Sequence, residues 1–358
     1  MSDIIVIGGG IAGLSAGARL SVSATVTVLE AETALGYHAS GRSAALFEPN
    51  YGSVSTVALS RASADYHHNA NGGYLSPRGL LIVGEAHQRA DFDRDVADLG
   101  VDPISPQEAL AMVPILDRNK VALAGYHADA QDIDTDRMLQ DFARQIRANG
   151  GAVLTGRRVG SIARENGRWR VACGPQVLEA ATLVNAAGAW ADQVARMAGA
   201  RPLGIAPHRR SMARLPAPGG HDVSRWPMFF GVNESWYAKP DAGALIVSPA
   251  DADPQEPQDA WADDMVLAEG LARYESMVTE PVTRMLGNWA GLRSFAPDRC
   301  LVLGRDVRLP EFVWCAGQGG YGFQTAPAAS RFVADTVLGR PPEIDAATAA
   351  ALSPGRFG

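Results

Sequence analysis

Residues 4–13 read IIVIGGGIAG and are followed, after a short segment, by VTVLE at residues 26–30. Four apolar residues without polar alternation predict a strand that is buried on both faces. The apolar residues at positions 11, 14 and 18 have the spacing of one helical face, so we expect a helix to pack on that strand. Because residues 26–29 predict a second buried strand, this part of the chain indicates a strand-helix-strand unit that binds a nucleotide.

Three glycines in this unit have separate roles. Gly8 permits the tight turn after the strand, Gly10 lets the backbone approach a pyrophosphate, and Gly13 lets the helix and strand pack closely. The phosphates would then meet the free N–H groups at the start of the helix. Glu30, at 30 − 8 = 22 residues after the first glycine, is placed to accept hydrogen bonds from ribose hydroxyls. Because Ala31 and not an arginine follows it, a 2′-phosphate would be repelled, which disfavours NADP.

A second glycine-rich turn lies near the other end of the chain. Residues 312–316 predict a buried strand, residues 317–322 read GQGGYG, and residues 323–338 predict a helix. The small residues of NAAGAW, at 185–190, would also let the backbone approach a cofactor closely. A cofactor held at both ends fits FAD better than NAD, and the second helix start would stabilise negative charge on the reduced flavin. The middle of the chain carries no second nucleotide cradle, so an NAD(P)H-driven flavin reductase is not expected.

The composition is that of an ordinary globular protein with room for two domains. Of the 358 residues, 47% are hydrophobic and 20% are charged. The net charge of −7, without any basic block, argues against nucleic-acid binding. The three cysteines, Cys173, Cys300 and Cys315, are too widely spaced for a redox pair or a zinc site, so no metal is expected. With no signal peptide or transmembrane run recognised, the expected location is cytoplasmic.

The pattern of strands and helices predicts an α/β protein. We expect a discontinuous Rossmann-like FAD-binding domain at 1–45, 130–200 and 296–345, and an α+β substrate domain with an antiparallel sheet at 46–129 and 201–295. Residues 346–358 are expected to form a loosely held tail. Further predictions are a short helical start at 43–46, helices at 54–69, 90–99 and 135–148, strands at 80–83 and 152–154, a hairpin of 159–164 with 168–173 around the Asn-Gly signal at 166–167, and a sheet of 228–230, 235–238 and 244–247.

Several motifs resemble those of one family over nearly the whole chain. They are IGGGIAG with Glu30, GYHASGRSAA at 36–45, DIDTD at 132–136, LVNAAGAW at 183–190, RRS at 209–211, WYAKPDAG at 236–243, WAGLRSF at 289–295 and GQGGYGFQT at 317–325. Together they resemble the FAD-dependent D-amino-acid oxidase and dehydrogenase family, and most closely the bacterial D-arginine dehydrogenases. The resemblance implies FAD as the cofactor. It also implies oxidative deamination of a D-amino acid to a 2-oxo acid and ammonia, by hydride transfer from the substrate Cα to flavin N5.

The resemblance further implies roles for individual residues. Arg293 matches an arginine that holds the substrate carboxylate, and its planar guanidinium suits a bidentate grip. Tyr51 and Tyr237 match tyrosines that hydrogen-bond the substrate, Arg210 matches a second pocket arginine, and the Gly320 carbonyl would lie by the substrate amine. The alternatives are an ion-paired or surface arginine for Arg293, core aromatic residues for the tyrosines, and a structural salt bridge for Arg210. The residues expected to contact FAD are Gly8, Gly10, Ile11, Ala12, Gly13, Glu30, Ala31, Ser40, Gly41, Arg42, Ser43, Ala44, Val159, Ala187, Gly188, Gly319, Gly320, Tyr321, Gly322, Phe323 and Gln324.

Two departures from the family pattern bear on the substrate. Residues 76–79, SPRG, are followed by Leu80, where members that prefer basic substrates carry an acid. The loop at 46–50 carries Glu48, where the family often has His or Thr. Glu48 either attracts a basic side chain or faces solvent. We therefore expect apolar or mixed D-amino acids as substrates.

The sequence does not identify the electron acceptor. Sarcosine-oxidase relatives place a lysine near the flavin in the strand that here reads LIV at 245–247, and its absence favours a dehydrogenase. No strong general base is demanded if the amine binds neutral, so His38 and His208 are expected in packing or surface roles. The alternative functions are a glycine- or sarcosine-type amine oxidase, which the same arginine would serve, and a non-catalytic FAD-binding assembly protein.

Overall fold

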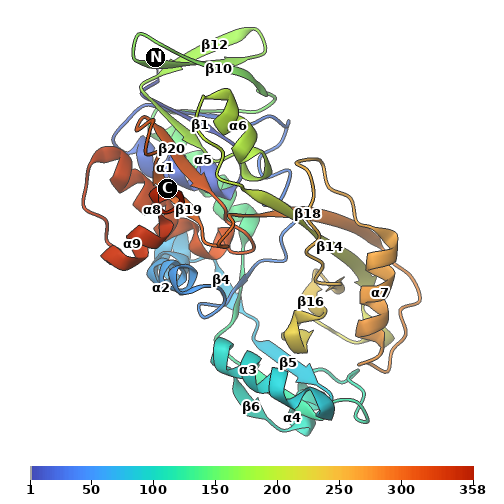
Figure 1. Ribbon diagram of the computed structural model, residues 1–358. Helices are drawn as coiled ribbons and strands as arrows, with labels where there is room; N and C mark the ends of the chain where they lie inside the picture. Colours follow the sequence, from blue (N-terminus) through green and yellow to red (C-terminus); the bar gives the residue numbers. More distant parts are fainter. Residues whose placement is uncertain (1) are drawn as a thin grey trace.

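A six-stranded sheet lies in the half of the molecule that holds both chain ends, in a computed structural model that describes residues 2–358 (Figure 1). Its order is β19-β20-β13-β1-β2-β9, and all neighbouring pairs are parallel except β19 with β20. Every residue of β1 and β20 is buried, which explains their unbroken apolar runs. The strands are β1 (Ile4–Ile7), β2 (Val26–Leu29), β9 (Ala152–Leu154), β13 (Thr182–Asn185), β19 (Val302–Arg305) and β20 (Phe312–Ala316).

Helices cover one face of this sheet, and a helix with a small second sheet covers the other. On the first face α1 packs against α5 and α8, while α2 packs against α8 and α9. The helices there are α1 (Ile11–Ser21), α2 (Val54–Asn69), α5 (Thr135–Ala148), α8 (Gly322–Leu338) and α9 (Ala346–Leu352). The opposite face packs on α6 (Ala191–Met197) and on the antiparallel strands β10 (Val159–Glu165), β11 (Arg168–Cys173) and β12 (Gln176–Ala180).

An eight-stranded sheet forms the second half of the molecule (Figure 1). Its order is β18-β14-β17-β16-β15-β5-β7-β6, and it is antiparallel except where β15 runs parallel to β5. The strands are β5 (Leu80–Gly84), β6 (Asp102–Ile104), β7 (Leu123–His127), β14 (Ala206–Pro216), β15 (Met228–Gly231), β16 (Tyr237–Asp241), β17 (Ala244–Ser248) and β18 (Gly287–Phe295).

Side-chain alternation gives the two faces of this sheet different neighbours. Leu81 and Val83 share a core with α4 (Pro106–Met112) and α7 (Asp264–Glu275). Leu80 and Ile82 point to the opposite face, together with Tyr237 and with Phe92 of α3 (Arg89–Leu99). The second face is the one that contributes side chains to the functional cavity described below.

The remaining elements are short. A small antiparallel sheet of order β3-β8-β4 consists of β3 (Leu46–Phe47), β4 (Leu75–Pro77) and β8 (Gln131–Ile133). Single 3₁₀ turns are η1 (Ala70–Gly72), η2 (Ala86–Gln88), η3 (Gly188–Trp190), η4 (Pro218–Gly220), η5 (Val232–Glu234) and η6 (Pro354–Phe357). None of the helices in residues 2–358 has the length and apolar character that a bilayer-spanning helix requires.

The predicted helices at 54–69 and 135–148 are confirmed, as is the hairpin at the Asn-Gly signal. The helical start predicted at 43–46 is wrong. Leu46 begins strand β3, which pairs with β8, and Ala45 has a φ of 27°, outside the right-handed helical range. The Lys239 ammonium also donates hydrogen bonds to the carbonyls of Ala44 and Ala45, which holds this backbone in a non-helical form. The strand predicted at 235–238 begins only at Tyr237.

The loose tail predicted for residues 346–358 is also wrong. This segment forms α9 and η6, and Leu352 is fully buried against the nucleotide-binding half. Arg356 forms an ion pair with Asp298 at 2.6 Å. Pro354 is the first residue of η6, a position that suits its fixed backbone angle, so it favours the observed structure.

The division into two domains stays a prediction, and one segment departs from it. Residues 46–129 were expected with the substrate domain. Within them, α2 packs on α8 beside the six-stranded sheet, and the buried Leu59 belongs to that core. The small residues of α2, such as Ser60 and Ser63, allow the close contact with α8, and the Ser63 hydroxyl donates to the Thr325 carbonyl.

Candidate active site

Two adjoining cavities run from the first glycine turn to the face of the large sheet. The large cavity has a volume of about 800 Å³ and the small cavity about 380 Å³. Gly10, Ser40, Gly188 and Leu292 line both, so the two form one extended cleft. An elongated dinucleotide fits such a cleft better than a compact ligand does, because each end meets a different set of residues.

The glycine turn after β1 leaves room only for backbone. A Cβ on Gly8 would lie 2.3 Å from the Ala186 carbonyl oxygen, and Gly8 has a φ of 112°. A Cβ on Gly13 would lie 1.9 Å from the Gly8 carbonyl oxygen. At the start of α1 the Ile11 amide donates to the Ser40 hydroxyl at 3.0 Å, on the wall of the large cavity. The helix start and its free amides therefore face the cleft, as a pyrophosphate group requires.

Glu30 lies at the end of β2 on the wall of the small cavity. One carboxylate oxygen accepts from the Gly9 amide at 2.7 Å and the other from the Glu32 amide at 2.8 Å. Each oxygen keeps a second lone pair, so the carboxylate can still accept from a ribose hydroxyl. The apolar Val194 and Trp190 line the same cavity. This combination of a fixed acceptor and apolar walls fits an adenosine.

Two arginines from neighbouring strands meet in the large cavity. Arg210 of β14 is paired in register with Gly291 of β18, and Arg293 follows two residues later on the same face. Arg210 donates to the Glu234 carboxylate at 2.8 Å, whereas the Nη1 atom of Arg293 lies 4.0 Å from that carboxylate. Within residues 2–358 no hydrogen-bond acceptor is found for the Arg293 guanidinium. Arg293 is therefore the cation of the cavity that is available to a ligand.

Gly320, shortly before α8, has no side chain and so leaves room for the Arg293 guanidinium beside it. A Cβ on Gly320 would lie 3.2 Å from Arg293 Cζ, which is closer than ordinary side-chain contacts. The guanidinium thus lies flat against bare backbone. The side chain of Arg293 keeps 23% of its surface exposed, and this exposed part faces the large cavity.

Aromatic residues complete the walls around the arginines. The Tyr51 hydroxyl donates to Glu234 at 2.9 Å, and the Tyr51 ring packs on Tyr321 with ring centroids 5.2 Å apart. The Arg210 guanidinium lies 5.8 Å from the centroid of the Tyr237 ring, and the Tyr237 hydroxyl contacts the Met212 sulfur at 3.3 Å. Burial raises the pKa of Tyr51 well above its ordinary value, so its hydroxyl stays protonated and acts as a hydrogen-bond donor.

The Glu234 carboxylate is charged in this setting. Burial alone would raise its pKa, but the charges of Arg210 and Arg293 and the hydrogen bonds from Arg210 and Tyr51 hold the pKa below its ordinary value. Burial likewise opposes the charge of Arg210, and Glu234 reverses this effect, so the pKa of Arg210 is raised. The pair therefore stays ionised.

Glu48 is buried in the wall of the large cavity. Its side chain is 3% exposed and lies 2.5 Å from His127 Nδ1, so the alternative in which it faces solvent is wrong. Burial raises the pKa of Glu48. The Glu48 amide contacts the Gln324 side chain at 3.4 Å, which connects this loop to the start of α8.

A lysine does lie near the large cavity, but it comes from β16 and not from β17, the strand in which the sequence has none. Lys239 of β16 is paired in register with Ile246 of β17 and lies on the cavity face of the sheet, as Tyr237 does. Its ammonium donates to the carbonyls of Ala44 and Ala45 and lies 2.9 Å from Asp132. Its charge is therefore compensated by the protein.

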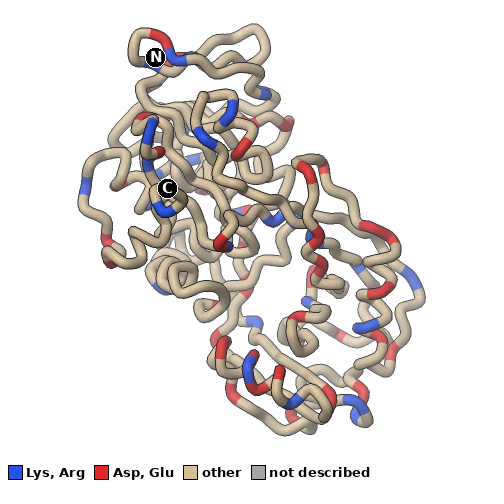
Figure 2. The backbone as a smooth tube through the Cα atoms, viewed as in Figure 1, with Lys and Arg blue, Asp and Glu red and all other residues tan. Residues whose placement is uncertain are grey.

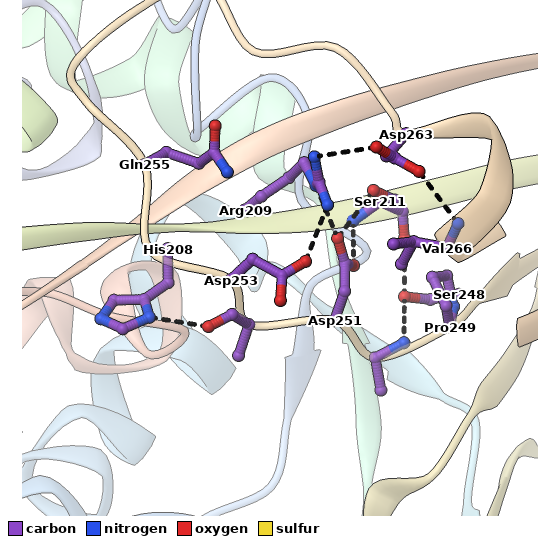
Figure 3. A network of polar contacts seen from close by, with 12 residues as sticks. His208, Arg209, Ser211, Ser248, Pro249, Asp251, Asp253, Gln255, Asp263 and Val266 are labelled. Atoms are coloured by element: carbon purple, nitrogen blue, oxygen red, sulfur yellow. Dashed lines mark hydrogen bonds and ion pairs between the residues drawn. The ribbon is translucent and has the colours of Figure 1, made fainter.

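Arg209 points away from the cavity although it is adjacent to Arg210. Figure 3 shows its guanidinium among the carboxylates of three aspartates. Arg209 is 3.0 Å from Asp251, 2.7 Å from Asp253 and 3.9 Å from Asp263. Asp251 also accepts from the amide and hydroxyl of Ser211. In the RRS motif one arginine therefore serves the cavity and the other anchors the loop that follows β17.

The predicted substrate residues all line the large cavity: Tyr51, Arg210, Tyr237, Arg293 and Gly320. Most residues predicted to contact FAD line one of the two cavities, and the exceptions are Gly13, Gly41 and Tyr321. Gly13 and Gly41 serve close backbone packing, and Tyr321 stacks on Tyr51. Arg42 lies on the wall, but its guanidinium donates to the carbonyls of Ala260 and Ala290. Sequence reasoning missed Glu234, Lys239 and His127, because no local pattern marks them.

Comparison with known proteins identifies the family. The family described as FAD dependent oxidoreductase matches residues 3–336. The chain belongs to this family. Its cofactor is FAD. FAD-dependent oxidoreductase domain-containing protein 1 of Bos taurus is 23% identical, and the alignment covers 94% of this chain and 81% of the bovine protein.

Solved structures of this flavoprotein fold superpose over almost the whole chain. Glycine oxidase from Geobacillus kaustophilus has a TM-score of 0.82 at 21% identity and covers 96% of each chain. L-proline dehydrogenase from P. horikoshii has a TM-score of 0.83 at 22% identity and covers 99% of this chain and 97% of its own. At these identities the likeness establishes a shared fold. The α/β fold with a Rossmann-like half is thereby confirmed.

Proposed function

We propose that this flavoprotein oxidises the C–N bond of a D-amino acid to give a 2-oxo acid and ammonia, and that it acts as a dehydrogenase. The observation that carries the proposal is the guanidinium of Arg293, which makes no hydrogen bond to residues 2–358 and lies against Gly320 in a cavity that joins the FAD cleft. A planar cation whose hydrogen-bond donors are free suits the carboxylate of an amino acid.

The chain's own residues bind and orient the substrate. Arg293 holds the carboxylate, and Tyr51, whose ring packs on Tyr321, lines the cavity beside it. The Gly320 carbonyl accepts a hydrogen bond from the substrate amine, which fixes the direction of the Cα–H bond. When bound, FAD supplies the acceptor for the hydride and its two electrons. Water then hydrolyses the released imino acid.

The shape of the cavity supports an apolar side chain on the substrate. Leu46, Leu80, Met228 and Phe230 are part of its lining. The resemblance to D-arginine dehydrogenases supports the D configuration, but Leu80 offers no charge to a basic side chain. Glu48 is paired with His127, so it provides little free charge for such a group. We therefore assign D-leucine or D-methionine as better substrates than D-arginine.

The dehydrogenase assignment rests on Lys239. Its ammonium is bound to two carbonyls and a carboxylate, so it is not free to assist a reaction of reduced flavin with O₂. An artificial dye should accept electrons from the reduced protein much faster than O₂ does. Fast peroxide formation in air would contradict this assignment.

A second candidate is an amine oxidase or dehydrogenase that acts on glycine or a secondary amine. It is supported by the fold shared with glycine oxidase and L-proline dehydrogenase. The test is product analysis with a dye acceptor: each D-amino acid, its L enantiomer, glycine, sarcosine and proline are assayed for 2-oxo acid and ammonia. The proposal expects equal amounts of both products from D-amino acids alone. Turnover confined to glycine, sarcosine or proline would favour the second candidate.

A further inference from the structure

The net charge around the carboxylate site is balanced by one substrate carboxylate and not by two. Arg210 and Arg293 contribute two positive charges, and Glu234 contributes one negative charge at 2.8 Å and 4.0 Å from them. The cluster therefore has a net charge of about +1 at neutral pH. Burial raises the pKa of Tyr51 and of Tyr321 beside the cluster, so both hydroxyls are uncharged there. One substrate carboxylate on Arg293 completes the neutralisation.

The backbone of the η5 turn and several hydrogen bonds fix the position of Glu234. It ends the η5 turn, in which Asn233 has a φ of 60° and Glu234 a φ of 50°. Two successive non-glycine residues in the left-handed region store strain that the surrounding contacts must offset. The Asn233 amide donates to Asp95 of α3 at 2.7 Å, and Tyr51 and Arg210 bind the Glu234 carboxylate itself.

We propose that Glu234 is a specificity-determining residue that restricts the active site to substrates with a single carboxylate. This inference rests on the proposed function, because it assumes that Arg293 holds the substrate carboxylate. Glu234 neutralises Arg210, which would otherwise attract a second carboxylate on the substrate side chain. About 34% of the Glu234 side chain remains exposed, so its charge also acts on whatever enters the cavity.

Two further acids line the same cavity and make no ion pair with Arg210 or Arg293. These are Asp95 and Asp98 of α3, and Figure 2 shows acidic and basic positions interspersed in that part of the chain. Asp98 is exposed and contacts neither arginine. It therefore provides a matched control, because Asp98→Asn removes the same charge from the cavity wall and leaves the arginine cluster unchanged.

The test is the binding of propionate and succinate to the FAD-loaded protein, measured by isothermal titration calorimetry at neutral pH. The wild type should bind propionate at least tenfold more tightly than succinate. Glu234→Gln keeps the size of the side chain and one acceptor oxygen for Arg210, while its amide nitrogen can donate to the Tyr51 hydroxyl. The variant should shift this ratio toward succinate by about tenfold to a hundredfold. The Asp98→Asn ratio should stay within about threefold of the wild type.

The outcomes separate this inference from the proposed function. If Arg293→Met binds propionate as tightly as the wild type, the carboxylate is not on Arg293 and the proposed function fails. If propionate binding depends on Arg293 but Glu234→Gln leaves the ratio unchanged, only the inference about Glu234 is overturned. A shift of equal size in Asp98→Asn would also overturn it. Should Glu234→Gln fail to fold, equal binding of the two acids by the wild type would decide against the inference.

Discussion

Replacing Arg293 by methionine should remove substrate binding without damaging the fold. The side chain makes no hydrogen bond to residues 2–358 and keeps 23% of its surface exposed, so the protein loses little when the guanidinium is removed. The substrate loses a charge-assisted, two-point contact. Removing one partner of such a pair costs about 2–5 kcal/mol, and the partial exposure places this site near about 3 kcal/mol. Since each 1.4 kcal/mol is a factor of ten, kcat/KM should fall about a hundredfold.

The assay is steady-state turnover of the best D-amino acid with a dye acceptor, together with FAD content and the midpoint of thermal unfolding. The variant should keep its FAD, and its Tm should change by no more than about 2 °C. Arg210→Met is the comparison, because it leaves the Glu234 carboxylate without its direct partner and should lower the Tm clearly. The reasoning is refuted if Arg293→Met retains kcat/KM within fivefold of the wild type, or if it is the less stable of the two variants.

Three further predictions concern neighbouring parts of the structure. Gly320→Ala places a Cβ 3.2 Å from Arg293 Cζ and should lower kcat/KM at least tenfold with FAD retained; unchanged kinetics would contradict the placement of Arg293. Arg209→Met leaves the 2%-exposed Asp251 without its cation and should destabilise the fold by about 2–4 kcal/mol in denaturant unfolding, whereas an unchanged midpoint would show that the network contributes nothing. Burial lowers the pKa of His67 to about 4 from 6.5, so its contribution to stability is complete above pH 6.5 and is lost as the pH falls toward 4, by about 3 kcal/mol at most. His67→Gln should flatten the stability profile over this range, and a profile as steep as that of the wild type would argue against a buried neutral histidine.

The nucleotide-binding half could be predicted from the sequence because its signals are local. Buried parallel strands read as unbroken apolar runs, and the first turn requires glycine because a Cβ on Gly13 would lie 1.9 Å from the Gly8 carbonyl oxygen. The substrate residues Arg293 and Tyr51 were predicted through motifs and not through physical reasoning on spacing. Their convergence depends on the register of β14 with β18 and on a loop far away in the chain.

The parts that could not be predicted depend on distant contacts. Glu234 is an ordinary turn residue in the sequence, and only folding brings it to Arg210 and Tyr51. Lys239 was overlooked because the neighbouring strand was considered, although the two strands are paired and share a face. The segment at 43–46 has good helix-forming residues, but strand pairing and the Lys239 contacts override that propensity.

The most direct test of the central claim is anaerobic reduction of the bound flavin. The purified protein, with its FAD spectrum confirmed, is mixed without oxygen with D- and L-amino acids, glycine and sarcosine, and loss of the visible flavin absorption is followed. The account predicts that apolar D-amino acids bleach the flavin, that their L enantiomers do not, and that Arg293→Met is bleached about a hundredfold more slowly at low substrate concentration. A fully loaded flavin that no member of the panel reduces would contradict the assignment of this cavity as an amino-acid site.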